Sequence, residues 1–283
     1  MGKYRKNLSG DLTFYSFIPT PVSNIHIIHT QHLDRLTTEV ESSIKRLNEK
    51  VTTLPEKQIQ TLMRQEIEYS CRLASGEPSM SFGFISDAEN RQIEDTENLL
   101  KATLYAFEAM TELPLSSRLL KNAHYLMCQS EKYTKKYPGE FRISPVWIGW
   151  KNENMDKALF IPPVQEDMIE AFTDLERYIH YDETENVFIR AALIHYQFEM
   201  IHPFIDANGR VGRLLNALFL KDKGMLDKPI LQHSYFLYKR AAIYYQEIQR
   251  VNETGCYEDW LNFYLESLKW AAEYTLNNLN TLS

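Results

Sequence analysis

Apolar side chains recur at helical spacing along most of this 283-residue chain. Between His32 and Leu47, apolar residues stand three or four positions apart with charged residues between them, the pattern of an amphipathic helix. The same spacing predicts further helices over residues 56–73, 93–112, 116–132, 166–180, 186–200, 213–223 and 237–283. With only 10 glycines and 11 prolines, the chain has few residues for the turns of an all-β fold. The sequence therefore predicts an all-α protein.

Three stretches depart from helical spacing. Residues 141–150 and 158–163 are rich in β-branched and aromatic side chains with Pro and Gly among them, which predicts a small β-hairpin or flap. The segment Phe17–Pro21 is expected to be extended, because proline disfavours the α region for the residue before it. Residues 75–87 concentrate Gly, Pro and Ser, so a loop should separate the N-terminal helices from the rest.

The composition excludes several classes of protein. A net charge of −7 argues against a nucleic-acid-binding surface, which needs a dense patch of Lys and Arg. No run of about 20 apolar residues is present that could cross a membrane. Three scattered cysteines without CxxC spacing, and an N-terminus without an apolar stretch, predict a soluble protein of the reducing cytoplasm.

The densest chemical sequence runs from Ile201 to Arg213, between one apolar helix and the start of the next. A loop that leads onto a helix N-terminus presents unpaired backbone N–H groups and the positive end of the helix dipole to a phosphate. Gly209 and Gly212 would let the backbone approach closely, and Arg210 adds fixed positive charge, as does Arg213. The segment predicts a phosphate-binding site.

Two residues of this segment suggest a reaction. His202 is able to take or give a proton near neutral pH, and Asp206 is an oxygen ligand suited to Mg²⁺. Together they indicate phosphoryl or nucleotidyl transfer. Taken singly, each has an ordinary alternative: a lone histidine is most often structural or exposed, and Asp206 or Asn208 could cap a turn or a helix. Their conjunction within twelve residues favours the functional interpretation.

At this point the residues resemble a known family. His202-Pro-Phe-Ile-Asp-Ala-Asn-Gly-Arg-Val-Gly-Arg213 resembles the signature of the Fic (filamentation induced by cAMP) family, His-Pro-Phe-x-Asp-Gly-Asn-Gly-Arg-x-x-Arg. Residues 138–142, 146–149 and 160–163 are similar to the family's flap region, and residues 66–75 to its N-terminal helical extension. The resemblance covers about residues 14 to 270.

The resemblance implies a Fic-like helical bundle with a small β-hairpin flap and a packed N-terminal helical lobe. Residues 1–95 would form the N-terminal helical extension and residues 96–283 the Fic core domain. It further implies a protein adenylyltransferase, which moves AMP from ATP to a Ser, Thr or Tyr hydroxyl of a target protein. Self-modification and a homodimer are further expectations, and no membrane or direct nucleic-acid partner is expected.

The resemblance also implies roles for individual residues. His202 would be the general base and Asp206 the Mg²⁺ ligand. Nucleotide binding would fall to Ala207, Asn208, Gly209, Arg210, Val211, Gly212 and Arg213, and less firmly to Tyr244 and Asn252. The flap residues Val146, Trp147, Ile148 and Gly149 would align a segment of the target.

The sequence departs from the family pattern at two positions. Ala207 replaces a glycine, which would strain the loop if that residue has a positive φ. Relatives with this extension carry Ser/Thr-x-x-x-Glu, whose Glu pairs with the last Arg of the signature, but here Ser70 is followed by Ala74. One interpretation is unrestrained activity; the other is that Glu68 or Glu77 supplies the charge.

Two alternative functions stay open. The same site could instead hydrolyse AMP from a target, although Ala74 at the regulatory position counts against this interpretation. A catalytically weak nucleotide-binding regulatory protein is the other alternative, favoured only by Ala207.

Overall fold

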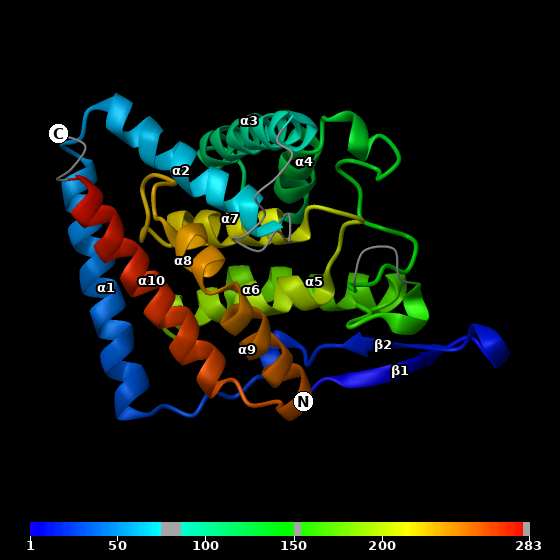
Figure 1. Ribbon diagram of the computed structural model, residues 1–283. Coiled ribbons are helices and arrows are strands. Elements are labelled where there is room, and N and C mark those ends of the chain that lie inside the picture. Colours follow the sequence, from blue (N-terminus) through cyan, green and yellow to red (C-terminus); the bar gives the residue numbers. More distant parts are fainter. Residues whose placement is uncertain (75–85, 150–153, 280–283) are drawn as a thin grey trace.

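Figure 1 shows a computed structural model of the chain, which describes residues 1–74, 86–149 and 154–279. Within them lie ten α-helices: α1 (Gln31–Val51), α2 (Glu56–Ala74), α3 (Ser86–Ala109), α4 (Ser117–Met127), α5 (Gln165–Tyr181), α6 (Val187–Ile201), α7 (Asn208–Asp222), α8 (His233–Lys239), α9 (Ala241–Thr254) and α10 (Glu258–Leu279). Short 3-10 helices occur at Gly10–Leu12, Val22–Asn24, Glu131–Tyr133 and Met155–Lys157. The predicted all-α class is confirmed.

Helices α6 and α7 form the centre of the molecule. Helix α6 is apolar on nearly all sides, and a helix of this kind is stable only when other elements surround it. It packs against α5, α7 and α10, while α2, α3 and α4 pack against α7 (Figure 1). The loop between α6 and α7 is therefore held between two buried helices.

The N-terminal helices α1 and α2 pack against one side of this centre. Helix α1 runs along α10, where Glu39 binds the Lys269 ammonium at 2.7 Å, and α2 lies between α8 and α3. Helix α2 also touches α7, which brings the N-terminal part of the chain to the site. The predicted boundary at residue 95 falls inside α3, and the division into extension and core stays a prediction.

The sheet of the described residues lies at the N-terminus rather than in the flap. Strands β1 (Lys3–Asn7) and β2 (Phe14–Ile18) pair antiparallel, with Lys3 opposite Ile18. The sequence analysis expected an extended segment here but no hairpin. In the described part of the predicted flap hairpin, residues 141–149 and 154–163, the pairing consists of one bridge between Ile148 and Phe160, and prolines 145, 162 and 163 lack the N–H that a longer ladder needs.

The single helix predicted over residues 237–283 is divided in the structure. This range contains the end of α8, then α9 and α10, and Gly255 ends α9 with a left-handed conformation at φ of 71°. Left-handed glycine is a common helix stop. No helix of the described residues is long and apolar enough to cross a membrane.

Candidate active site

The loop between α6 and α7 turns the chain with two left-handed residues. His202 ends α6 at φ 50° and Ala207 precedes α7 at φ 64°. The Asn208 side chain closes the loop, because its Oδ1 accepts from the Phe204 N–H at 2.8 Å and its Nδ2 donates to the Phe204 carbonyl at 2.9 Å. Asn208 thus acts within the loop, and its predicted contact with a phosphate stays a prediction.

Ala207 has a positive φ, so alanine in place of the family's glycine strains the backbone at this position. A non-glycine residue in the left-handed region carries about 1–2 kcal/mol of steric cost. His202 carries a similar cost four residues before the motif's Asp206. Such strain persists only where the surroundings over-determine the backbone, and it gathers at functional loops.

His202 is arranged to present a lone pair. Its Nδ1 lies 3.3 Å from the carbonyl oxygen of Glu199, which can only accept, so Nδ1 carries the proton and Nε2 the lone pair. Burial, with the Arg142 charge, lowers the pKa of His202 to about 4. The imidazole is therefore neutral at physiological pH and able to accept a proton through Nε2.

Arg142 binds the backbone of this loop, and the sequence analysis did not single it out. Its side chain is 1% exposed and donates to the carbonyl oxygens of His202 at 2.8 Å and of Pro163 at 2.6 Å. Its backbone N–H donates to the Pro203 carbonyl at 2.9 Å. One guanidinium thus joins the flap segment to the left-handed turn at His202. The run Pro138–Arg142 is the signal that could have marked it.

His124 is a second residue that the sequence analysis missed. Its Nδ1 accepts from the Gly139 N–H at 2.8 Å, so Nε2 carries the proton toward the carbonyl oxygen of Asp206 at 3.2 Å. Its ring stacks on Phe204 with 3.9 Å between centroids. Burial lowers its pKa to about 4, which keeps this bonding pattern at neutral pH.

Asp206 presents a carboxylate of suitable chemistry for Mg²⁺. Its Oδ1 accepts from the Ala207 N–H at 2.5 Å, and its Oδ2 binds the Lys136 ammonium. Burial opposes ionisation, yet the Lys136 contact holds the pKa of Asp206 below its ordinary value. Among the described residues no three carboxyl, imidazole or thiol groups gather as a metal site. One carboxylate nevertheless fits Mg²⁺ that is held mainly by substrate phosphates.

Arg210 is held by Tyr133, Asp95 and Asp206, although the resemblance gives it a phosphate. Its guanidinium is buried, donates to the Tyr133 hydroxyl at 2.5 Å and lies 3.5 Å from Asp95 and 3.8 Å from Asp206. Lys132 also binds Asp95. In this arrangement Arg210 supports the metal-ligand side of the loop, and its role toward phosphate stays a prediction.

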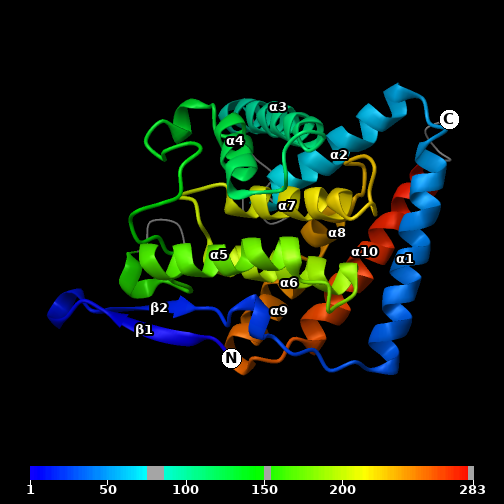
Figure 2. The ribbon, with the colours of Figure 1, turned by 180° about the vertical axis from the view of Figure 1, so that it is seen from behind.

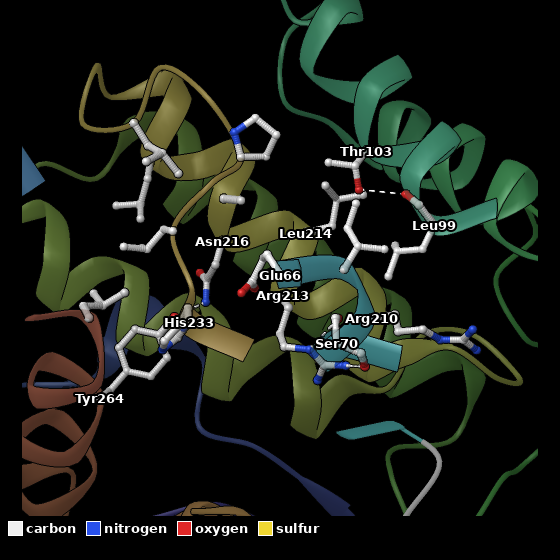
Figure 3. A pocket seen from close by; sticks show the side chains of 17 residues that line it. Glu66, Ser70, Leu99, Thr103, Arg210, Arg213, Leu214, Asn216, His233 and Tyr264 are labelled. Carbon is white, nitrogen blue, oxygen red and sulfur yellow. Dashed lines mark hydrogen bonds between the residues drawn. The ribbon is translucent and has the colours of Figure 1, made fainter. Parts of the chain in front are cut away.

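Arg213 is held by the N-terminal extension. Its Nε donates to the Ser70 hydroxyl at 2.8 Å and its Nη2 to the Ser70 carbonyl at 2.7 Å (Figure 3). Helix α2 therefore engages this arginine through a neutral serine, with Ala74 one turn beyond it. Of the two carboxylates considered above, Glu68 binds Arg72, and Glu77 lies outside the described residues.

A cavity lies behind this contact, between α2, α3, α7 and α10. Figure 3 shows Glu66, Ser70 and Arg213 at its edge, and its volume is about 50 Å³. Both Glu66 oxygens accept from the Ser234 N–H at 3.0 Å, and burial raises the pKa of Glu66 to about 7. The cavity is too small for a nucleoside triphosphate, since small-molecule sites usually exceed about 300 Å³.

The two glycines and the valine of the motif serve packing. A Cβ on Gly212 would lie 2.6 Å from Oε1 at the flexible end of Glu199 and 3.1 Å from Cδ1 of Phe198, so a larger residue would displace these two side chains of α6. A Cβ on Gly209 would lie 3.1 Å from Nη1 of Arg213, and Val211 is fully buried. Burial raises the pKa of Glu199 to about 7, although the Arg213 charge opposes this. Contact of these residues with a nucleotide stays a prediction.

Tyr244 and Asn252 lie in the core beside α6. The Tyr244 hydroxyl lies 2.8 Å from Nε2 of His195, and Asn252 accepts from the Tyr196 hydroxyl at 2.6 Å. Both are nearly fully buried, at 2% and 8% exposed. Their predicted place in a nucleotide pocket is untested.

The flap residues lie on the surface near the loop. Trp147 and Ile148 are 42% and 40% exposed, large fractions for apolar side chains. Ile148 exchanges backbone hydrogen bonds with Phe160, with nitrogen to oxygen distances of 2.8 and 3.1 Å. Val146 is half-buried and Gly149 is exposed. The flap therefore offers an apolar surface, and its docking role stays a prediction.

Comparison with known proteins agrees with this geometry. Residues 114–220 match the Fic/DOC family. A probable protein adenylyltransferase of Aquifex aeolicus is 28% identical over 149 residues, which is 45% of this chain and 46% of that protein. The protein adenylyltransferase Fic of Drosophila melanogaster is 36% identical over 86 residues, 29% of this chain and 16% of that protein. The chain thus spans less than half the length of these curated relatives.

Solved structures show the same fold. A Fic family protein from Desulfovibrio desulfuricans G20 superposes with a TM-score of 0.71 at 21% identity, over 89% of this chain and 76% of that chain. Fic-1 (residues 134–508) from C. elegans gives a TM-score of 0.63 at 16% identity, over 88% and 74%. These likenesses show that the chain has the fold of those Fic structures. Residues 114–220 form a domain of the Fic/DOC family.

Proposed function

We propose that this protein transfers AMP from ATP to a Ser, Thr or Tyr hydroxyl of a target protein. The observation that carries the proposal is the loop from His202 to Ala207, which places a neutral imidazole and a carboxylate before the N-terminus of α7. The names of the curated relatives support the same activity. The two strained left-handed residues around this loop support a functional role for it, because backbone strain of this kind gathers at functional sites.

The chemistry follows from the groups present. Nε2 of His202 takes the proton of the target hydroxyl, and the oxygen attacks the α-phosphorus of ATP. The bond between the α-phosphorus and the bridging oxygen breaks, and pyrophosphate leaves with that oxygen. The N-terminus of α7 stabilises the negative charge on the phosphates, because its first backbone N–H groups lack partners within the helix.

Asp206 would hold Mg²⁺, which supplies neutralisation of phosphate charge when bound. The Lys136 ammonium now occupies the same carboxylate and must move aside, which places a second cation beside the phosphates. Arg213 would bind the terminal phosphate once it is released from Ser70. This chain's own residues thus bring positive charge to the loop from two directions.

The contact between Ser70 and Arg213 bears on regulation. A neutral serine restrains Arg213 less than a carboxylate would, so we expect basal ATP turnover that Ala74→Glu reduces. The Ala74→Gln variant is the matched control, since it adds the same bulk without the charge. Equal turnover in the two variants would contradict this interpretation.

Intact mass spectrometry after incubation with ATP and Mg²⁺ tests the function. We expect the wild-type protein to gain the mass of AMP by self-modification, His202→Ala to gain none, and the exposed-histidine control His32→Ala to behave as wild type. ATP binding without any gain, with or without candidate targets, would instead favour the nucleotide-binding regulatory protein. Loss of AMP from a modified protein in the absence of ATP would favour the hydrolase.

Partner and location follow from the same proposal. The activity requires a target protein, and a homodimer remains an expectation. Cys71 and Cys128 are buried thiols and Cys256 is exposed, with no disulfide among them, which agrees with a reducing cytoplasm as the proposed location.

A further inference from the structure

The N-terminal hairpin is joined to the flap. The Phe17 side chain is 1% exposed, and its backbone N–H donates to the Ile161 carbonyl at 2.8 Å. Its ring also packs on Phe160 with 5.7 Å between centroids. Phe160 in turn pairs with Ile148 of the flap. The base of the hairpin and the flap therefore form one continuous structure.

The outer half of the hairpin projects from the helical body (Figures 1 and 2). It carries Leu8, Leu12 and Tyr15, which are 66%, 73% and 55% exposed. Apolar side chains scattered singly on a surface are ordinary, but several on one projecting element mark an interaction surface. The outer half of the hairpin thus exposes these three apolar side chains to solvent, and they do not belong to the hydrophobic core.

A groove of about 440 Å³ runs between the hairpin and the chain that leads into and out of the flap. Leu8 and Phe14 lie on the hairpin side, and Ile143, Pro145 and Val164 lie on the other. Ile143 is 70% exposed. The groove thus has apolar side chains on both walls, and its charged lining residues are Arg5, Lys6 and Glu166.

The outward backbone edge of β2 makes no hydrogen bond at Tyr15 to any other described segment. Because the Phe17 N–H points to Ile161 and away from β1, the next outward groups on that edge belong to Tyr15. Among the described residues, Tyr15 makes no backbone bond to the flap segment. An extended segment can add to such an edge as a strand, with affinity from main-chain hydrogen bonds.

The charge of the hairpin indicates the chemistry of its partner. Residues 1–13 hold three basic side chains and one acidic one, which gives this segment a net charge of +2. Because the whole chain has a net charge of −7, residues 14–283 have a net charge of −9. Arg5 is bound to Asp167 at 2.9 Å, but Lys3 and Lys6 make no ion pair among the described residues. A basic arm on an acidic body attracts an acidic segment.

We infer that the hairpin is a second docking element for the target protein, which binds an extended segment of alternating acidic and apolar residues in the groove. This inference rests on the proposed function, since it places the segment beside the flap that would align the acceptor hydroxyl. Continuity with the flap and the basic charge favour a protein segment. An anionic membrane surface would repel the acidic body of the protein, which disfavours a membrane as the partner of the hairpin.

Binding of a defined peptide tests this surface without requiring catalysis. The probe is a fluorescein-labelled peptide of about eight residues, in which glutamate alternates with leucine or threonine, and the comparison probe has lysine for every glutamate. In fluorescence anisotropy with the full chain, the acidic peptide should bind at least tenfold more tightly than the basic one. The double variant Lys3→Glu with Lys6→Glu, which reverses two charges, should bind the acidic peptide at least tenfold more weakly than the wild type. The double variant Leu8→Ser with Leu12→Ser should show the same loss of peptide affinity.

Matched controls keep the inference separate from the proposed function. Lys45→Glu with Lys50→Glu changes two lysines of α1 and should leave peptide binding unchanged. All hairpin variants should retain ATP binding, self-modification and the thermal midpoint of the wild type. Absence of binding by the wild type, or equal binding by the hairpin variants, would overturn the inference. So would vesicles with phosphatidylserine competing for the arm, or a dimer that dissociates in the hairpin variants without a change in peptide binding.

Discussion

Replacing Ala207 by glycine measures the strain stored in the loop. Ala207 has a φ of 64° and is 6% exposed, so its methyl group is both sterically strained and buried. Glycine removes the strain, loses the buried methyl group and adds freedom to the unfolded chain. Only the first of these three effects stabilises the folded protein.

The three effects nearly cancel at this position. Relief of the left-handed conformation is worth about 1–2 kcal/mol. Lost burial of one methyl group costs about 0.8 kcal/mol, and the greater freedom of unfolded glycine costs about 0.4–1 kcal/mol. We therefore expect Ala207→Gly to change the free energy of unfolding by less than about 0.8 kcal/mol in either direction.

A buried alanine in an ordinary helix is the matched control. Ala171 lies in α5 and is 9% exposed, so its methyl group is buried to a similar extent. In Ala171→Gly the loss of burial and the glycine penalty act together, for a total of about 1.2–1.8 kcal/mol. The difference between the two variants is the left-handed strain.

Thermal unfolding resolves this difference. At about 2.1 cal/mol/K per residue, the unfolding entropy of a chain of this length is on the order of 0.6 kcal/mol/K. Ala171→Gly should then lower the thermal midpoint by about 2–3 °C, while Ala207→Gly should leave it within about 1 °C of wild type. Equal losses in both variants would show that the loop carries no strain at Ala207, and the reasoning would fail.

Three further variants test the remaining features of the site. Gly212→Ala should lower the free energy of unfolding by no more than about 1 kcal/mol, because its Cβ displaces the flexible end of Glu199 at 2.6 Å and presses on Phe198 at 3.1 Å; calorimetry should show partial recovery when Glu199→Ser is added. Arg142→Met should cost about 3 kcal/mol or more and abolish self-modification, because it leaves the His202 carbonyl and its neighbours unpaired; an unchanged thermal midpoint would contradict this. Glu66, whose pKa is raised to about 7, binds its proton more tightly when folded, so its stabilising contribution is lost as pH rises from about 4.5 to about 7. Glu66→Gln should therefore gain about 1–2 kcal/mol relative to wild type between pH 5 and pH 8 in paired thermal melts, and a constant difference would refute the assignment.

Much of the fold was predictable because it depends on local pattern. Helical spacing of apolar residues located α1 and α2 within a few residues, since an amphipathic helix leaves a periodic sequence. The position of the loop between α6 and α7 was predictable for a similar reason, because its residues are contiguous, and phosphate binding by this loop stays a prediction. The break at Gly255 shows the limit of this approach, since a single left-handed residue interrupts an otherwise continuous pattern.

What could not be predicted depends on contacts between distant segments. Ser70 meets Arg213 across 143 positions, and Arg142 meets His202 across 60. His124 joins Gly139 to the Asp206 carbonyl of the loop, and no spacing in the sequence relates these residues. The hairpin was missed because β1 contains mostly charged and exposed residues, which give no alternation of apolar and polar side chains.

The support of the loop is uneven, and this bears on how the site would open. Arg142, His124 and Asn208 bind its backbone through buried bonds that a ligand has no means of replacing. Arg213 is different, because both of its bonds go to the neutral Ser70, whereas a phosphate would offer a charged, bidentate partner of roughly twice the strength. Under the proposed function we therefore expect a phosphate to replace Ser70 at Arg213 without a change in the loop itself. A carboxylate at position 74 would remove this advantage, since it would match the phosphate in charge.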